Sequence, residues 1–151
     1  MAPLHRAAAL SFARMLVAIK VGNLHFVARL EEEAAPKTCH AFQSMLPLET
    51  QLIQARWSGE AAWIPMGELE LGLGYENQTS HPAPGELLLF PGGISETEIL
   101  FPYGPTVFAS KVGQLAGNHF ATIYEGNEQL ADVGELVLWK GAQEISFTAI
   151  E

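Results

Sequence analysis

The stretch MLVAIKVGNLHFVARL, residues 15–30, decides the fold, because it contains two apolar segments joined by a short turn. Gly22-Asn23 is a residue pair typical of the two-residue turn of a β-hairpin. We therefore predict strands at 15–21 and 24–30. Side chains alternate along a strand, and we expect Leu16 and Ala18 to share a face with Phe26 and Ala28. The chain thus begins its regular structure as an antiparallel hairpin.

Two short helices are predicted further along the chain. Phe42, Met45 and Leu46 fall at the i, i+3, i+4 spacing of one helical face, and Pro47 ends that element. The second helix lies within 127–140, where apolar residues again repeat at helical spacing. These residues are Leu130, Val133, Leu136 and Val137.

The rest of the sequence is typical of short strands separated by turns. We predict strands at 50–57, 61–66, 86–90, 94–101, 106–112, 119–124 and 144–150. Residues 67–84 are rich in Gly, Pro, Asn and Ser, which predicts a long loop of the kind that often carries function. So few helices argue against a doubly wound parallel sheet, which needs a helix after nearly every strand. Because closure removes exposed sheet edges, we predict a closed β-barrel.

Composition limits the class of protein. A length of 151 residues, with 48% hydrophobic and 17% charged residues, indicates one globular domain. The net charge of −9 argues against nucleic acid and anionic membranes as partners. A single cysteine, Cys39, excludes an internal disulfide and favours a cytoplasmic location. The apolar run near the N-terminus is too short and too charged to cross a bilayer, so we predict an extension at 1–14 and the barrel domain at 15–151.

Several motifs resemble those of cyclophilins. The strand HFVARL at 25–30, followed by APKT at 35–38 and Phe42, resembles the strand-to-helix signature of that family, and GNHF at 117–120 is similar to its Gly-any-His run. Further motifs resemble a group of uncharacterised bacterial proteins with the same fold: RWSGE at 56–60, PAPGE at 82–86, PGG at 91–93 and FASKVG at 108–113. The resemblance implies a mostly β, closed, cyclophilin-like barrel of about eight strands with two short helices.

The cyclophilin resemblance also implies two candidate catalytic residues. Arg56 corresponds to the arginine that points at the prolyl nitrogen in that family, and His119 corresponds to a histidine of its pocket. Two departures count against peptidyl-prolyl isomerisation: AAWI at 61–64 replaces the Phe-Met-any-Gln stretch, and Gln114 replaces the pocket tryptophan. Isomerase activity therefore stays an alternative hypothesis.

We predict that a cleft at the barrel binds a small polar or amide-bearing ligand. Arg56 and His119 would act there with further ligand-binding candidates, which are Trp57, Glu60, Trp63, Tyr103 and Asn118. Each has a structural interpretation as well. Arg56 can form an ion pair with Glu60, His119 can be a histidine at the edge of the core, and the tryptophans can be core or interface anchors.

Two other features have a possible chemical or assembly role. Glu96 and Glu98 alternate, so their carboxyl groups would project from one face of a strand and share a proton or hold a cation, although a solvated face is the commoner arrangement. No spacing supports a metal site, and no cofactor is predicted. A third hypothesis is a structural role as a symmetric homo-oligomer, anchored by aromatic residues: Trp57, Phe101, Tyr103 and Trp139.

Overall fold

The computed structural model describes residues 15–150, so the extension predicted at 1–14 lies outside the described residues. Eight strands form an antiparallel barrel in the order β2-β1-β11-β3-β4-β7-β6-β10, and the pairing of β2 with β10 closes it. The barrel strands are β1 (Leu16–Val21), β2 (Leu24–Leu30), β3 (Leu48–Gln54), β4 (Gly59–Pro65), β6 (Glu86–Phe90), β7 (Glu98–Thr106), β10 (Gly117–Glu125) and β11 (Gln143–Ile150).

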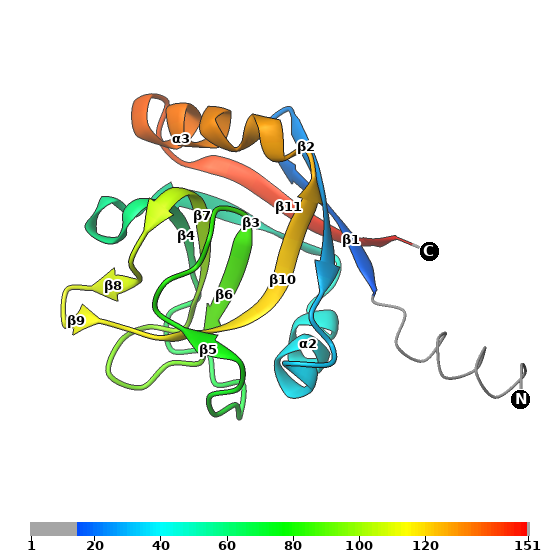
Figure 1. Cartoon of the computed structure of the whole chain (residues 1–151), viewed down its shortest axis with the longest axis vertical. Helices are drawn as coiled ribbons and strands as arrows, with labels where there is room; N and C mark the ends of the chain where they lie inside the picture. The colour runs from blue at the N-terminus through cyan, green and yellow to red at the C-terminus, as the bar shows by residue number, and fades with distance from the viewer. Residues whose placement is uncertain (1–14, 151) are drawn as a thin grey trace, which may run out of the picture.

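Two helices cover the two ends of the barrel (Figure 1). Helix α3 (Leu130–Trp139) follows the 3₁₀ turn η2 (Asn127–Gln129) and packs on β7, β3 and β4, whereas α2 (Pro36–Gln43) packs on β10 at the opposite end. The prediction of a mostly β, closed barrel with two short helices is confirmed. Within residues 15–150, neither helix has the length and apolar character needed to span a membrane.

Three minor strands lie outside the barrel. The short strand β5 (Gln78–Thr79) lies within the long loop that the sequence predicts at 67–84, and it pairs with β10. Strands β8 (Ala109–Ser110) and β9 (Gly113–Gln114) pair with each other as a separate hairpin. This hairpin and the chain around it lie beside the outer surface of the barrel (Figure 1).

The first hairpin has the predicted turn but not the predicted faces. Val21 pairs with Leu24 across the turn, so Ile19 lies opposite Phe26 and Val17 lies opposite Ala28. All four of these paired residues are buried in the core. The expectation that Leu16 and Ala18 share the face of Phe26 and Ala28 is therefore wrong, because odd-numbered residues of β1 lie opposite even-numbered residues of β2.

Four other predicted elements also have wrong boundaries. The strand predicted at 50–57 ends at Gln54, and the chain then forms the 3₁₀ turn η1 (Arg56–Ser58). The Ser58 hydroxyl donates to the Ala109 carbonyl and accepts from the Ala109 N–H, which holds η1 against β8. The strand predicted from 94 begins only at Glu98, and the one predicted at 106–112 is divided between the end of β7 and the β8–β9 hairpin. Helix α2 ends at Gln43, so its predicted last turn is missing.

Strands β4, β7 and β6 are buried on both faces. Their inward side chains belong to the barrel interior, which includes Phe26, Phe101 and Phe120. Their outward side chains form a second apolar cluster with residues of the segment around the β8–β9 hairpin, and its members are Ala61, Leu88, Phe90, Leu100, Phe108 and Leu115. Trp63 packs against this outer cluster. Polar groups at the edge of the cluster are therefore removed from water, which matters for the site described below.

The contact between Gly134 of α3 and Tyr103 of β7 sets how closely the helix approaches the barrel. A Cβ atom at Gly134 would overlap the Tyr103 ring. We expect Gly134→Ala to lower the free energy of unfolding, because overpacking against Tyr103 costs about 1–3 kcal/mol. The higher helix propensity of alanine, about 1 kcal/mol relative to glycine, offsets only part of this loss. Urea denaturation measures the change. Gly74→Ala is the control, since a Cβ atom there meets nothing within 4 Å. A Gly134→Ala protein as stable as the wild type would contradict this packing.

Candidate functional site

Trp57 of η1 and Trp63 of β4 meet on the outer side of the barrel. Their ring centroids are 5.7 Å apart and their planes are at 79°, an edge-to-face arrangement that aromatic pairs favour. The two rings line a pocket of about 300 Å³, which we call the tryptophan pocket. Its other lining residues are Ser95, Glu96, Glu98, Ser110 and Lys111.

The strand register explains why these side chains converge. In the β4–β7 pair, Trp63 lies opposite Leu100 and Pro65 lies opposite Glu98. Because side chains alternate along a strand, Trp63 and Glu98 project from the same outer face as diagonal neighbours. A β-bulge between Gly59 and Ala61 interrupts the pairing near the start of β4, just after η1. Strand β4, turn η1, the approach to β7 and the β8–β9 turn therefore all contribute to the pocket.

Glu98 is the unusual residue of the pocket. Only 2% of its surface is exposed, and its Oε2 atom has no hydrogen-bond partner within the described chain. Burial, and to a smaller extent the neighbouring Glu96 carboxylate, raise the pKa of Glu98 from 4.5 to about 8. The carboxyl group is therefore mostly protonated at neutral pH.

Trp63 supplies a second unpaired polar atom. Its indole Nε1 is buried and has no hydrogen-bond partner among residues 15–150. A buried polar group without a partner costs about 1–3 kcal/mol. Two such groups on residues that line one pocket make this pocket the candidate site for a molecule whose own polar groups would pair with them.

The carboxyl pair predicted from the sequence does meet in this pocket. Glu96 lies just before β7 and Glu98 begins it, so the two residues are not on one strand as expected, but both line the same cavity. The solvated-face interpretation is wrong for Glu98, which is buried under the outer apolar cluster. Sequence reasoning did not include Glu98 or Lys111 among the site residues. The available signal for Glu98 was an ionisable residue at the start of the apolar run EILF, 98–101.

Of the seven site residues predicted from the sequence, only Trp57 and Trp63 line the tryptophan pocket. Arg56 precedes Trp57 in η1 and is exposed, and it forms no ion pair with Glu60 in the described part of the chain. Glu60 is exposed too, and its side chain lies against Gly104. The predicted cleft is therefore not assembled as one cavity.

Asn118 and Tyr103 have structural partners instead. The Asn118 side-chain amide donates to Thr38 Oγ1 at 3.1 Å and to the Gly74 carbonyl at 3.0 Å, and its Oδ1 accepts from the Glu76 N–H at 3.1 Å. These bonds tie β10 to α2 and to the long loop. Tyr103 packs beneath α3 and donates its hydroxyl to Gln54 Oε1 at 3.1 Å.

His119 belongs to a polar chain on β10 and β2. Its Nε2 lies 2.8 Å from the Thr122 hydroxyl, which donates to Glu31 Oε2 at 2.6 Å. Because the single hydroxyl proton of Thr122 goes to the carboxylate, His119 Nε2 must carry a hydrogen and act as the donor. Glu31 also pairs with Arg29 at 3.7 Å, and the Arg29 guanidinium lies 5.7 Å from the Tyr124 ring centroid. The structure thus places His119 in this series of hydrogen-bonded side chains and not in the lining of the tryptophan pocket.

Cys39 has no nucleophilic character. It is buried in α2, where its thiol donates to the Phe120 carbonyl at 3.3 Å. Burial raises the pKa of Cys39 to about 12, so the thiol stays protonated at physiological pH. Within residues 15–150, no three His, Cys, Asp or Glu side chains are grouped so that they could hold a metal ion.

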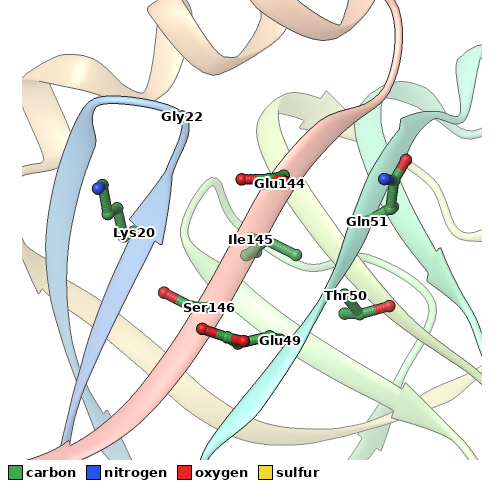
Figure 2. Close-up of a pocket in the computed structure, with 8 residues that line it drawn as sticks. All are labelled: Lys20, Gly22, Glu49, Thr50, Gln51, Glu144, Ile145 and Ser146. Atoms are coloured by element: carbon green, nitrogen blue, oxygen red, sulfur yellow. The ribbon is translucent and has the colours of Figure 1, made fainter.

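A second hollow, of about 380 Å³, lies on the outer face of β1, β11 and β3 (Figure 2). Its charged residues are Lys20, Glu49 and Glu144, all exposed, and Figure 2 shows them spread along the three neighbouring strands. None of the buried unpaired polar atoms of the described chain belongs to its lining. The tryptophan pocket is therefore the better candidate for a specific site.

Comparisons with known proteins agree with this fold. Residues 17–149 match the family model described as protein of unknown function, DUF3830. The structure of McbB in complex with tryptophan has a TM-score of 0.63 and 15% sequence identity, and the match covers 87% of this chain and 44% of McbB. This chain thus spans less than half the length of McbB. No protein with a curated description matches the sequence.

A second solved structure is similar along nearly its whole length. The hypothetical protein AF2241 from Archaeoglobus fulgidus has a TM-score of 0.58 and 18% identity, and the match covers 91% of this chain and 95% of AF2241. At such low identities the two likenesses show the shared barrel fold alone. The match to a family of unknown function agrees with the resemblance between the motifs after residue 55 and a group of uncharacterised bacterial proteins.

The buried Glu98 carboxyl should make stability depend on pH. The unfolded chain loses this proton near pH 4.5 and the folded chain near pH 8, so the contribution of Glu98 to the free energy of unfolding falls as the pH rises between these values. We expect Glu98→Gln to match the wild type near pH 4.5 and to become progressively more stable than it up to about pH 8. Urea denaturation across this range measures the difference. Glu125→Gln, at an exposed site, should follow the wild-type curve. A constant difference between Glu98→Gln and the wild type would contradict the assigned burial.

Proposed function

This chain belongs to the DUF3830 family, whose function is unknown, and we propose that it binds a small molecule in the tryptophan pocket. The ligand would combine an apolar body, which contacts Trp57 and Trp63, with a polar group that reaches Glu98. This is the polar or amide-bearing ligand that the sequence predicts, now assigned to a different set of residues.

One observation carries the proposal. The Glu98 Oε2 and Trp63 Nε1 atoms are both buried without partners among residues 15–150, and both residues line the same pocket. Native proteins pair nearly all buried polar groups, so two unpaired groups on residues that line one cavity call for an explanation. A bound molecule that pairs with these atoms would remove the cost of leaving them unpaired.

The volume and the lining of the pocket support the same conclusion. A volume of about 300 Å³ falls at the lower end of the range for small-molecule sites. Tryptophan rings supply a large apolar contact area, and a few polar groups then fix the orientation of the ligand. McbB was solved with tryptophan bound, which supports the idea that this barrel fold accommodates a small molecule.

Arg56 is proposed as a residue at the rim of the pocket and not as a catalytic group. It adjoins Trp57 in η1 and its side chain is exposed, so it is free to approach a ligand that extends beyond the indole rings. Isomerase chemistry of the cyclophilin kind would need Arg56 and His119 at one cavity. His119 instead pairs with Thr122 on β10, so the binding function is the better supported one.

Calorimetric titration with four indole compounds tests the binding proposal: L-tryptophan, tryptamine, indole-3-propionamide and indole-3-propionate. We expect at least one of them to bind the wild type at one site. Trp63→Phe should weaken that binding by about tenfold, because it removes part of the indole contact surface together with the Nε1 donor. Trp139→Phe is the matched control, since Trp139 is 72% exposed on α3 and lies outside the pocket. Absence of binding by every compound, or equal losses in the two variants, would count against the site.

We also propose that α3 forms a symmetric contact between two copies of the chain. Trp139 is 72% exposed and lines a hollow of about 430 Å³ with Leu24 and Leu136. Tryptophan is enriched at protein interfaces. Two of the anchors predicted from the sequence are wrong, however, because Phe101 is fully buried and Tyr103 packs beneath α3.

Light scattering at micromolar concentration tests the contact through α3. We expect a dimer for the wild type and a monomer for Trp139→Lys, because the charged side chain would replace the exposed ring at the contact. Ile94→Lys, at a residue 74% exposed away from α3, should stay dimeric. A monomeric wild type would show that Trp139 is exposed for another reason.

A further inference from the structure

We propose that the tryptophan pocket selects an organic ammonium ion, meaning a protonated primary or secondary amine on an apolar body, over neutral or anionic molecules of the same shape. The inference rests on the proposed function, because it names the chemical class of the ligand for that same pocket. Four observations support it.

The first observation is the arrangement of carboxyl groups. Glu96 and Glu98 line the tryptophan pocket, which adjoins a wider groove of about 700 Å³ and shares with it the lining residues Ser95, Glu96 and Lys111. Glu68 and Glu70 line that groove. Even with Glu98 protonated, the three other carboxylates outnumber the one lysine on these walls. The resulting negative charge favours a cation and disfavours an anion.

The second observation is the buried carboxyl at the inner end of this acidic lining. Glu98 is 2% exposed and its Oε2 has no partner in residues 15–150, so it is set apart from the exposed acids on the groove wall. An ammonium group offers N–H donors together with a positive charge, and hydrogen bonds to charged groups are stronger than those between neutral groups. An ion pair between a ligand ammonium group and the Glu98 carboxylate would offset the desolvation of the carboxylate. A hydrogen bond from a neutral amide would offset less of it.

The third observation is the pair of indole rings. Trp57 is half exposed, so part of its ring surface is open to a ligand, and Trp63 meets it at 79°. Tryptophan is the aromatic side chain that attracts organic cations most strongly. Aromatic rings beside a carboxylate are the combination that recognises alkylammonium groups by charge and by apolar contact together.

The fourth observation separates an organic cation from a metal ion. Within the described residues no group of three ionisable or sulfur ligands is arranged around a point, although two of the carboxyl groups share the pocket. Ca²⁺ needs six to eight oxygen ligands and Mg²⁺ needs octahedral coordination. An apolar wall of two tryptophans offers neither, whereas it suits the hydrocarbon part of an amine.

Proton release follows from this inference. In the free protein the Glu98 carboxyl is mostly protonated at pH 7, since its pKa is about 8. A bound ammonium group favours the carboxylate, so binding should release a proton and tighten as the pH rises toward 8. The ionisable groups that face Glu98 across the pocket are Glu96 and Lys111, while the neighbouring strands present Pro65 and Phe90.

Titration with three indoles tests the inference: tryptamine, indole-3-propionamide and indole-3-propionate. Each has a short side chain, and the group at its end is a cation, a neutral amide and an anion, respectively. We expect tryptamine to bind wild-type protein about tenfold or more tightly than the amide at pH 7.5, and the propionate most weakly. Repeating the tryptamine titration in buffers of different ionisation enthalpy should reveal proton release. Its affinity should rise between pH 6 and pH 8, whereas that of the neutral amide should not.

Two variants assign these effects to the pocket. Glu98→Gln should remove the proton release and the preference for tryptamine while it leaves the fold intact, because glutamine is close in shape to the protonated carboxyl. Trp57→Ala, at a half-exposed site, should weaken tryptamine binding without changing the proton release. Glu125→Gln, exposed and outside the pocket, should leave both unchanged. Excess CaCl₂ at constant ionic strength should not displace tryptamine.

The outcomes that oppose the inference are distinct from those that oppose the site. If the amide or the propionate binds as tightly as tryptamine, the preference for a cation is overturned and the binding site itself survives. Displacement of tryptamine by Ca²⁺ would overturn the organic character of the cation. If none of the three compounds binds and L-tryptophan does not bind either, the proposed function fails and the inference fails with it.

Discussion

The antiparallel pairing of β4 with β7 is the constraint on which the site depends. This register puts Pro65 opposite Glu98 and Trp63 opposite Leu100, which directs the side chains of Trp63 and Glu98 to the outer face of the barrel. On most barrels of soluble proteins that face would be exposed to solvent. Here the chain around β8 and β9 covers it with Phe108 and Leu115, so the Glu98 carboxyl sits at the margin of an apolar cluster. A slip of one residue in the register would turn Glu98 toward the barrel interior.

Local sequence signals predicted much of the fold. The Gly22-Asn23 turn fixes the first hairpin, and the helical spacing within 127–140 gives α3. The boundaries that were missed depend on contacts between distant segments. The Ser58 hydroxyl at the end of η1 bonds to Ala109, and the Thr97 hydroxyl, just before β7, donates to the Leu69 carbonyl at 2.6 Å. Residue patterns within a short window carry no information about such partners.

The candidate site was predicted less well than the fold, for a related reason. Trp57 and Trp63 are close in sequence, and both were selected and do meet. Glu98 was noticed as half of a carboxyl pair, but the sequence did not show that it lies opposite Phe90 of β6, whose ring in turn contacts Phe108. Asn118 and Tyr103 were selected for residue type, yet their partners come from α2, the long loop and β3. Residue type indicates which chemistry is available. Only the tertiary contacts decide whether those polar groups already have hydrogen-bond partners within the fold.

The contrast between Asn118 and Glu98 gives the strongest reason to regard the tryptophan pocket as functional. Both residues are buried and polar, and both lie on barrel strands. The Asn118 side chain has three hydrogen bonds, which use both of its N–H groups and its oxygen. Glu98 Oε2, by contrast, has no hydrogen-bond partner among residues 15–150. Arg29 Nε and Gln54 Nε2 have none either, but only Glu98 and Trp63 combine an unpaired buried atom with a place in the lining of the tryptophan pocket. Because local rules are commonly violated where function requires it, the unpaired atom beside an open cavity is better explained by a ligand than by the stability of the barrel.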